Sequence, residues 1–103
     1  MIQRVVAIKL KDAYAHDADR AQVAAASREV LGAVPTVRTI EVATPADAAT
    51  TKSWDLLLLL QFDDLDGVEA YRAHPNHRRY VDVFLRPMLE VIKVWNFELR
   101  AEG

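Results

Sequence analysis

Three side chains suited to proton transfer, Tyr71, His74 and His77, lie within one seven-residue segment. A histidine near its ordinary pKa of about 6.5 can accept a proton at neutral pH, and a tyrosine hydroxyl can donate to a developing oxyanion. Val81 and Phe84 follow His77 at positions i+4 and i+7, so we expect His77 to begin the apolar face of a helix. Partial desolvation there would lower the histidine pKa and favour its neutral, basic form.

A proline divides this segment. Because the residue before a proline avoids the α region, one helix should end near His74 and the next should start at Pro75. The resulting bend can bring Tyr71 and His77 together. Structural roles stay open for both: Tyr71 as a core aromatic with a bonded hydroxyl, and His77 as a partner of a backbone carbonyl. We interpret His74 as a structural residue of the helix junction.

The sequence argues against metal and thiol chemistry. The chain has no cysteine, which excludes disulfide scaffolds, thiolate zinc sites and cysteine nucleophiles. His74 and His77 lie on either side of a proline, and no fixed carboxylate accompanies them. We therefore expect neither a metal nor a cofactor.

Length and composition indicate one globular domain over residues 1–103, with 51% hydrophobic and 27% charged residues. A net charge of -2 argues against a nucleic-acid partner, because such modules usually have a basic face. The longest apolar run, Leu56 to Leu60, is too short to cross a bilayer, and no signal peptide is visible at the start. We expect a soluble, cytoplasmic protein without a membrane partner.

The pattern of elements predicts a β-α-β-β-α-β order, which is an α+β ferredoxin-like fold. Its four-stranded antiparallel sheet should have the order 4-1-3-2, with the helices on one face. The first helix should be capped by Asp17 or Asp19, and residues 44–53 should form a loop. The expected strands are 2–10, 36–43, 54–62 and 92–99, and the expected helices are 17–31, 64–74 and 75–90 with a bend at Pro87.

The alternation of side chains along the strands predicts a pocket between sheet and helices. Residues of one parity on two strands share the helix-covered face. Arg4 is one of them and could bind a carboxylate or a phenolate there, or else reach solvent as an ordinary arginine at a strand end. The predicted site consists of His77 and Tyr71 as the catalytic pair, with Arg4, Val6, Ile8, Leu56, Leu58 and Phe84 as substrate-binding residues.

The run of leucines also predicts a partner. It is apolar on both parities, so Leu57 and Leu59 should lie on the sheet face that no helix covers, beside Val5 and Ala7. A soluble monomer rarely exposes such a patch. We therefore expect a homodimer formed through the sheet face.

Four stretches of the chain resemble the stress-responsive A/B barrel family, a branch of the dimeric α+β barrel proteins. The resemblance covers nearly the whole chain, and its most specific part is the His-Pro-x-His step that follows a tyrosine. It implies a dimer formed through the sheets. The stretches are Ile2-Gln3-Arg4-Val5-Val6-Ala7-Ile8-Lys9-Leu10, Pro35-Thr36-Val37 leading to Ile40-Glu41-Val42, Tyr71-Arg72-Ala73-His74-Pro75-Asn76-His77, and Trp95-Asn96-Phe97.

The family includes a plant polyketide cyclase that makes olivetolic acid, and the resemblance implies that Tyr71 and His77 match its acid/base pair. Histidines occupy the cyclase positions that match Arg4 and Leu56, and aromatic residues occupy those that match Val23 and Ser27. These departures predict a wider, differently charged pocket and put the cyclase's own substrate in doubt.

Two functions remain after these considerations. The first is a cofactor-independent enzyme that performs acid/base chemistry on a small aromatic or polyketide-like substrate. The alternative is a non-catalytic stress-responsive dimer or a protein that binds a small apolar ligand. A third function, that of a quinone-forming monooxygenase as in other dimeric α+β barrel enzymes, has no distinctive motif here.

Overall fold

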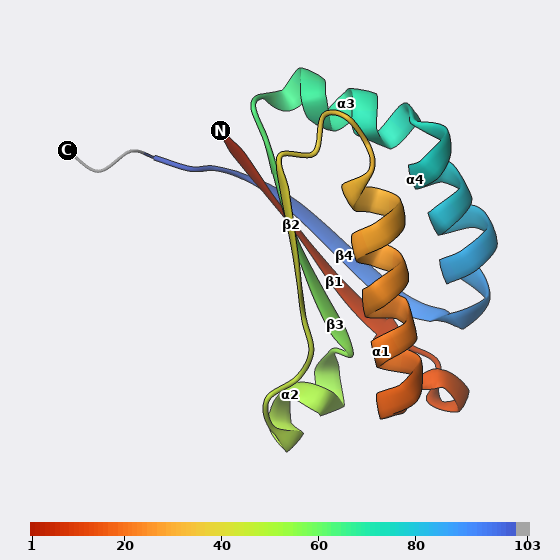
Figure 1. Ribbon diagram of the computed structural model, residues 1–103. Helices are drawn as coiled ribbons and strands as arrows, with labels where there is room; N and C mark the ends of the chain where they lie inside the picture. Colours follow the sequence, from red (N-terminus) through yellow and green to blue (C-terminus); the bar gives the residue numbers. More distant parts are fainter. Residues whose placement is uncertain (101–103) are drawn as a thin grey trace.

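The computed structural model describes residues 1–100 and shows a sheet with helices packed on one of its faces (Figure 1). The sheet is antiparallel, and its strands follow the order β2-β3-β1-β4, as the β-α-β-β-α-β pattern predicted. This is a ferredoxin-like α+β fold. The strands are β1 (Ile2–Leu10), β2 (Thr39–Ala43), β3 (Leu56–Phe62) and β4 (Leu89–Glu98).

The helical layer is built from short pieces joined end to end. Its first half is α1 (Asp17–Ala26), which continues as the π-helical segment η2 (Ser27–Leu31). Its second half follows β3 and runs through α3 (Leu65–Ala73), α4 (Pro75–Arg79), the π-helical η3 (Tyr80–Leu85) and the 3-10 turn η4 (Arg86–Met88). The 3-10 turn η1 (Asp12–Tyr14) and the helix α2 (Ala48–Ser53) lie outside this layer.

The helix break falls where the proline predicted it. His74 has an extended backbone, with φ of -66° and ψ of 139°, and it separates α3 from α4. Its Nδ1 accepts a hydrogen bond from the Asn76 backbone N–H at 3.1 Å, so the ring caps the second helix. The chain changes direction between α3 and α4 (Figure 1).

Several predicted details were wrong. Neither Asp17 nor Asp19 caps α1; the N-cap position is His16, and Asp17 instead binds Arg20 one turn later. The predicted loop 44–53 contains α2, whose N-cap Asp47 accepts from the Thr50 N–H. The second strand starts at Thr39 rather than 36, because a turn in which the Val37 N–H donates to the Val34 carbonyl at 3.0 Å precedes it. The last strand starts at Leu89 rather than 92, because the helical segment ends at Met88.

The burial of side chains along the central strand β3 alternates between the two faces of the sheet. Along β3, the even-numbered residues from Leu56 to Phe62 are buried under the helices, while Leu57 and Leu59 are only half-buried on the other face. On that same face, Trp95 and Phe97 of β4 are 46% and 55% exposed. The uncovered face is therefore a broad apolar surface. No helix among residues 1–100 is long and apolar enough to cross a membrane.

Candidate functional site

A small cavity of about 40 Å³ lies between the sheet and the second half of the helical layer. That volume holds about one water-sized group, since a water occupies roughly 30 Å³ in the liquid. Its walls include most of the predicted site residues, namely Arg4, Val6, Ile8, Leu58, Tyr71 and His77. Its remaining walls are Leu31, Tyr80, Val81, Leu85, Ile92 and Val94.

The structure does not bring the other two predicted residues to this cavity. Leu56 is buried farther along β3, where it contributes to a separate apolar pocket with Trp54 and Pro45. Phe84 packs on Tyr80, with ring centroids 5.6 Å apart, and contacts the core without lining this cavity.

The two proton-transfer candidates lie together. The rings of Tyr71 and His77 are 4.6 Å apart between centroids and tilted by 55°. His77 Nδ1 lies 3.1 Å from the carbonyl oxygen of Arg72. A carbonyl oxygen can only accept, so Nδ1 carries the proton and the neutral ring keeps a free lone pair on Nε2. This tautomer has its basic nitrogen available.

Electrostatics favour the neutral form of both side chains. Desolvation lowers the pKa of His77 below its ordinary 6.5, and the Arg4 charge lowers it further, although the Arg72 carbonyl opposes them. Burial strongly raises the pKa of the Tyr71 hydroxyl, which Arg4 offsets in part. At neutral pH the pair is therefore an unprotonated imidazole beside a protonated phenol, as a general base and a general acid require.

Arg4 is the charged group of the cavity and is only 8% exposed. Its Nη1 donates to Asn96 Oδ1 at 3.0 Å, and its guanidinium carbon lies 6.0 Å from the centre of the Tyr71 ring. Within residues 1–100 no carboxylate forms an ion pair with Arg4, and its buried Nε has no hydrogen-bond partner. Desolvation accordingly lowers the pKa of Arg4.

The cavity is narrower than the small side chains of α1 and η2 predicted. Ser27 leaves space on the first helical segment, but Tyr80 of η3 fills it. The Tyr80 hydroxyl lies 2.6 Å from Ser27 Oγ, which itself donates to the Val23 carbonyl at 2.6 Å. A tyrosine supplied by the opposite helix thus replaces the bulk that the first helix lacks.

Two residues important for this geometry were not predicted. Asn96 holds Arg4 from the neighbouring strand, and the register that pairs Arg4 with Asn96 was implicit in the antiparallel order of β1 and β4. Tyr80 follows His77 by three residues, so helical spacing alone could have placed it on the same face. In the described part of the chain, no three His, Cys, Asp or Glu side chains converge as metal ligands.

The fold and the site define a class of ferredoxin-like α+β proteins with a cavity between sheet and helices. The chain also matches the family model of the stress-responsive A/B barrel domain over residues 2–99. It therefore belongs to this family. No curated protein sequence matches the chain.

Solved structures agree with this fold. One is a protein from Mesorhizobium loti that is described as a Dabb family protein, Dabb being the short name of the stress-responsive A/B barrel domain, with a ferredoxin-like fold. It is 19% identical, with 97% of each chain covered and a TM-score of 0.81. A dimeric protein of unknown function with the same fold, from Bacteroides fragilis, is 25% identical over 95% of each chain, with a TM-score of 0.75. The hydroxynitrile lyase of Passiflora edulis is 14% identical over 99% of this chain and 95% of that one, with a TM-score of 0.79.

Proposed function

We propose that the protein is a cofactor-independent enzyme that moves a proton on a small aromatic or polyketide-like carbonyl compound. The observation that carries this proposal is the convergence of Tyr71 and His77 on one cavity, in the protonation states that the chemistry needs. The fold supports enzymes elsewhere, since a hydroxynitrile lyase shares it. Fold alone does not define the reaction.

In the proposed reaction, His77 Nε2 removes a proton from the carbon next to a carbonyl group, and the electron pair of that C–H bond forms an enolate. Tyr71 donates a hydrogen bond to the enolate oxygen, and the Arg4 charge stabilises it. Return of the proton from His77 to another position of the substrate completes the transfer. No oxidant or cofactor is needed.

Exchange of a C–H proton for deuterium tests this chemistry without the natural substrate. We would follow the α-protons of phenylacetone in D₂O by NMR, with and without the protein. His77→Asn should slow the catalysed exchange by about 10²–10⁴-fold, and Tyr71→Phe should slow it less. His74→Asn is the matched control, because this histidine caps α4 and does not line the cavity.

Exchange no faster than that produced by free imidazole would support the alternative, a non-catalytic dimer or a protein that only binds a small ligand. Under that alternative His77 is structural, so His77→Asn should lower the melting temperature instead. Circular dichroism on each variant separates the two outcomes.

We further propose that two copies pair through the uncovered sheet face. Leu57 and Leu59 lie on it among other apolar side chains, and the related protein from Bacteroides fragilis is described as dimeric. Burial of a leucine contributes about 1.5–3 kcal/mol, so Leu59→Asp should produce monomers or aggregates. Size exclusion with light scattering measures this, and a wild-type monomer at micromolar concentration would contradict it.

A further inference from the structure

The inner cavity beside Arg4 carries a positive charge that the described part of the chain does not neutralise. Arg4 is a wall of this cavity and is only 8% exposed, so water screens its charge poorly. It forms no ion pair within residues 1–100, its Nη1 donates to the neutral Asn96 amide, and its buried Nε has no acceptor there. A buried cation is usually matched by an anion and by a full set of hydrogen bonds. Arg4 has neither within these residues.

The other walls of the cavity bring no negative charge. None of its lining residues is an aspartate or a glutamate. The titratable residues that face Arg4 across it are Tyr71, Tyr80 and His77. Burial raises the pKa of both tyrosines and lowers the pKa of the histidine, so all three are neutral at neutral pH. The rest of the lining is apolar, and an anion inside the cavity would therefore meet one cation and no repelling group.

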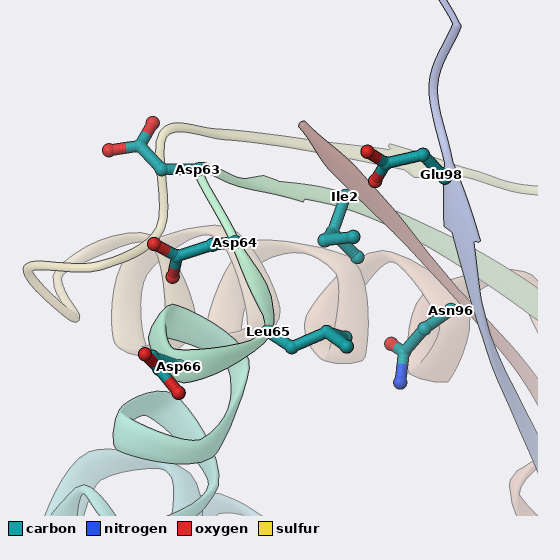
Figure 2. Close-up of a pocket in the computed structure, with 7 residues that line it drawn as sticks. All are labelled: Ile2, Asp63, Asp64, Leu65, Asp66, Asn96 and Glu98. Atoms are coloured by element: carbon teal, nitrogen blue, oxygen red, sulfur yellow. The ribbon is translucent and has the colours of Figure 1, made fainter.

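The outer cleft on the far side of Asn96 has the opposite character. Asn96 lines this cleft together with four acidic residues, which are Asp63, Asp64, Asp66 and Glu98 (Figure 2). The three aspartates point away from Asn96 in Figure 2, and within residues 1–100 none of the four forms an ion pair with Arg4. The outer cleft thus repels anions without neutralising Arg4, so an anion site belongs to the inner cavity alone.

One carboxylate, that of Glu69, acts on Arg4 through space and raises its pKa, but it has a closer partner. Its Oε1 lies 3.1 Å from Arg72 Nη1 on the surface, and the Arg72 charge lowers the pKa of Arg4. The two exposed charges oppose each other at Arg4, which leaves the guanidinium without a counter-ion.

We propose that the inner cavity binds one compact monovalent anion of halide size, chloride in ordinary salt solutions, against the Arg4 guanidinium. The cavity volume of about 40 Å³ admits about one water-sized group, so a halide ion fits and a tetrahedral anion such as sulfate does not. A single negative charge also matches the single positive charge, whereas a divalent anion would leave a buried charge unmatched. A water molecule there would give Arg4 an acceptor but no counter-charge.

The line width of the chlorine NMR signal tests the proposal on the whole protein. Chloride held by a protein relaxes faster than free chloride, so exchange between the two broadens the line. We would titrate chloride against a background of sulfate, which occupies exposed basic side chains. The broadening should persist in sulfate and disappear when bromide is added.

Removing the charge should remove the site. Arg4→Gln should raise the chloride dissociation constant by about ten- to a hundredfold, as expected for lost hydrogen bonds to a charged group. Arg79→Gln is the matched control, because Arg79 is an exposed arginine of α4 that does not line the cavity, and it should leave the constant unchanged.

Two variants that keep Arg4 test charge and space separately. Asn96→Asp places a carboxylate where the amide accepts from Arg4, so chloride affinity should fall about tenfold or more. Val81→Ile adds one methylene to a wall of the cavity and should also weaken chloride binding. Val83→Ile adds the same group on η3 at a position that is 69% exposed and outside the cavity, and it should have no effect. Circular dichroism verifies that each variant is folded.

Broadening that sulfate abolishes, or that is equal in Arg4→Gln and the wild type, would overturn the inference, because it would place the chloride on surface side chains. Absence of any excess broadening would overturn it too, since water alone would then occupy the cavity. Chloride binding through Arg4 in a protein that catalyses no C–H exchange would uphold the anion site and reject only the proposed proton transfer. Where both hold, chloride should slow the exchange, because it occupies the place of the enolate oxygen beside Arg4.

Discussion

Two buried charges near opposite ends of β1 differ in how completely their hydrogen-bond and ion-pair partners are supplied. Asp55, directly before β3, is fully buried, and its carboxylate accepts from the Leu10 N–H at 2.8 Å and from Arg20 Nε at 2.9 Å. Lys9 Nζ lies 3.5 Å from the same carboxylate. Arg4, at the other end, is nearly as buried but has one neutral partner and one unpaired donor among residues 1–100.

The difference is between a buried charge whose partners are complete and one whose partners are not. The Asp55 carboxylate joins β1, β3 and α1, and its partners are complete without any ligand. The Arg4 guanidinium lacks such completion and lines a cavity with two proton-transfer groups. Burial is common to both, so the number of satisfied partners distinguishes them.

The largest effect on stability should come from removing Asp55, the buried charge whose partners are complete. Asp55→Ala leaves Arg20 and Lys9 without their buried partner, so the free energy of unfolding should fall by about 3–5 kcal/mol. Urea unfolding followed by circular dichroism measures it. Asp63→Ala is the matched control, because Asp63 also pairs with an arginine, Arg38, but on the surface, and its loss should leave the urea midpoint almost unchanged. Equal shifts of the urea midpoint in Asp55→Ala and Asp63→Ala would contradict the prediction that the buried carboxylate contributes more to stability than the surface one.

A smaller effect should come from the neutral polar pair of Tyr80 and Ser27. Tyr80→Phe removes the hydroxyl that lies 2.6 Å from Ser27 Oγ, and it should lower the free energy of unfolding by about 1 kcal/mol. Ser27 keeps its bond to the Val23 carbonyl. A double-mutant cycle with Ser27→Ala isolates the pair, and additive effects of the two single changes would show that the hydroxyl contact contributes nothing.

Arg4, the buried charge that lacks a full set of partners, should contribute little to stability. Arg4→Met keeps most of the packing volume and removes a poorly paired buried cation, so the unfolding free energy should stay within about 1 kcal/mol of the wild type or rise. The same urea experiment applies. A loss comparable to that of Asp55→Ala would mean that Arg4 is a structural residue.

The smallest effect is a pH dependence from His77. Its pKa is lowered in the folded protein, so the unfolded chain binds the proton more readily below about pH 6.5. The stabilising contribution of the neutral ring is complete above that pH and is lost as the pH falls from 6.5 towards the folded pKa. His77→Asn should flatten this part of a melting-temperature profile; a profile that keeps the wild-type shape in this variant would contradict the assignment.

Sequence patterns predicted the fold well, because side-chain alternation and proline chemistry act locally. Leu56 to Phe62 alternate as expected, and the helix break falls at His74, directly before Pro75. The site was predicted less completely. Phe84 was placed by helical spacing, but η3 is π-helical, which changes the angle between successive residues, and Tyr80 faces the cavity while Phe84 stacks behind it. The contacts of Asp55 with the Leu10 N–H and Arg20 join segments that are distant in sequence, so no local sequence pattern predicts them.

The position of Arg4 in a central strand limits how this family member can change length. Because β1 pairs with both β3 and β4, removing or adding one residue beside Arg4 would turn the side chains on one side of the change, Arg4 among them, to the opposite face of the sheet. Arg4 would then emerge on the uncovered apolar surface, and an apolar neighbour would enter the cavity. We therefore expect a one-residue insertion or deletion to be tolerated in the loops around α2, whereas the same change beside Arg4 would move a buried charge onto the uncovered face of the sheet.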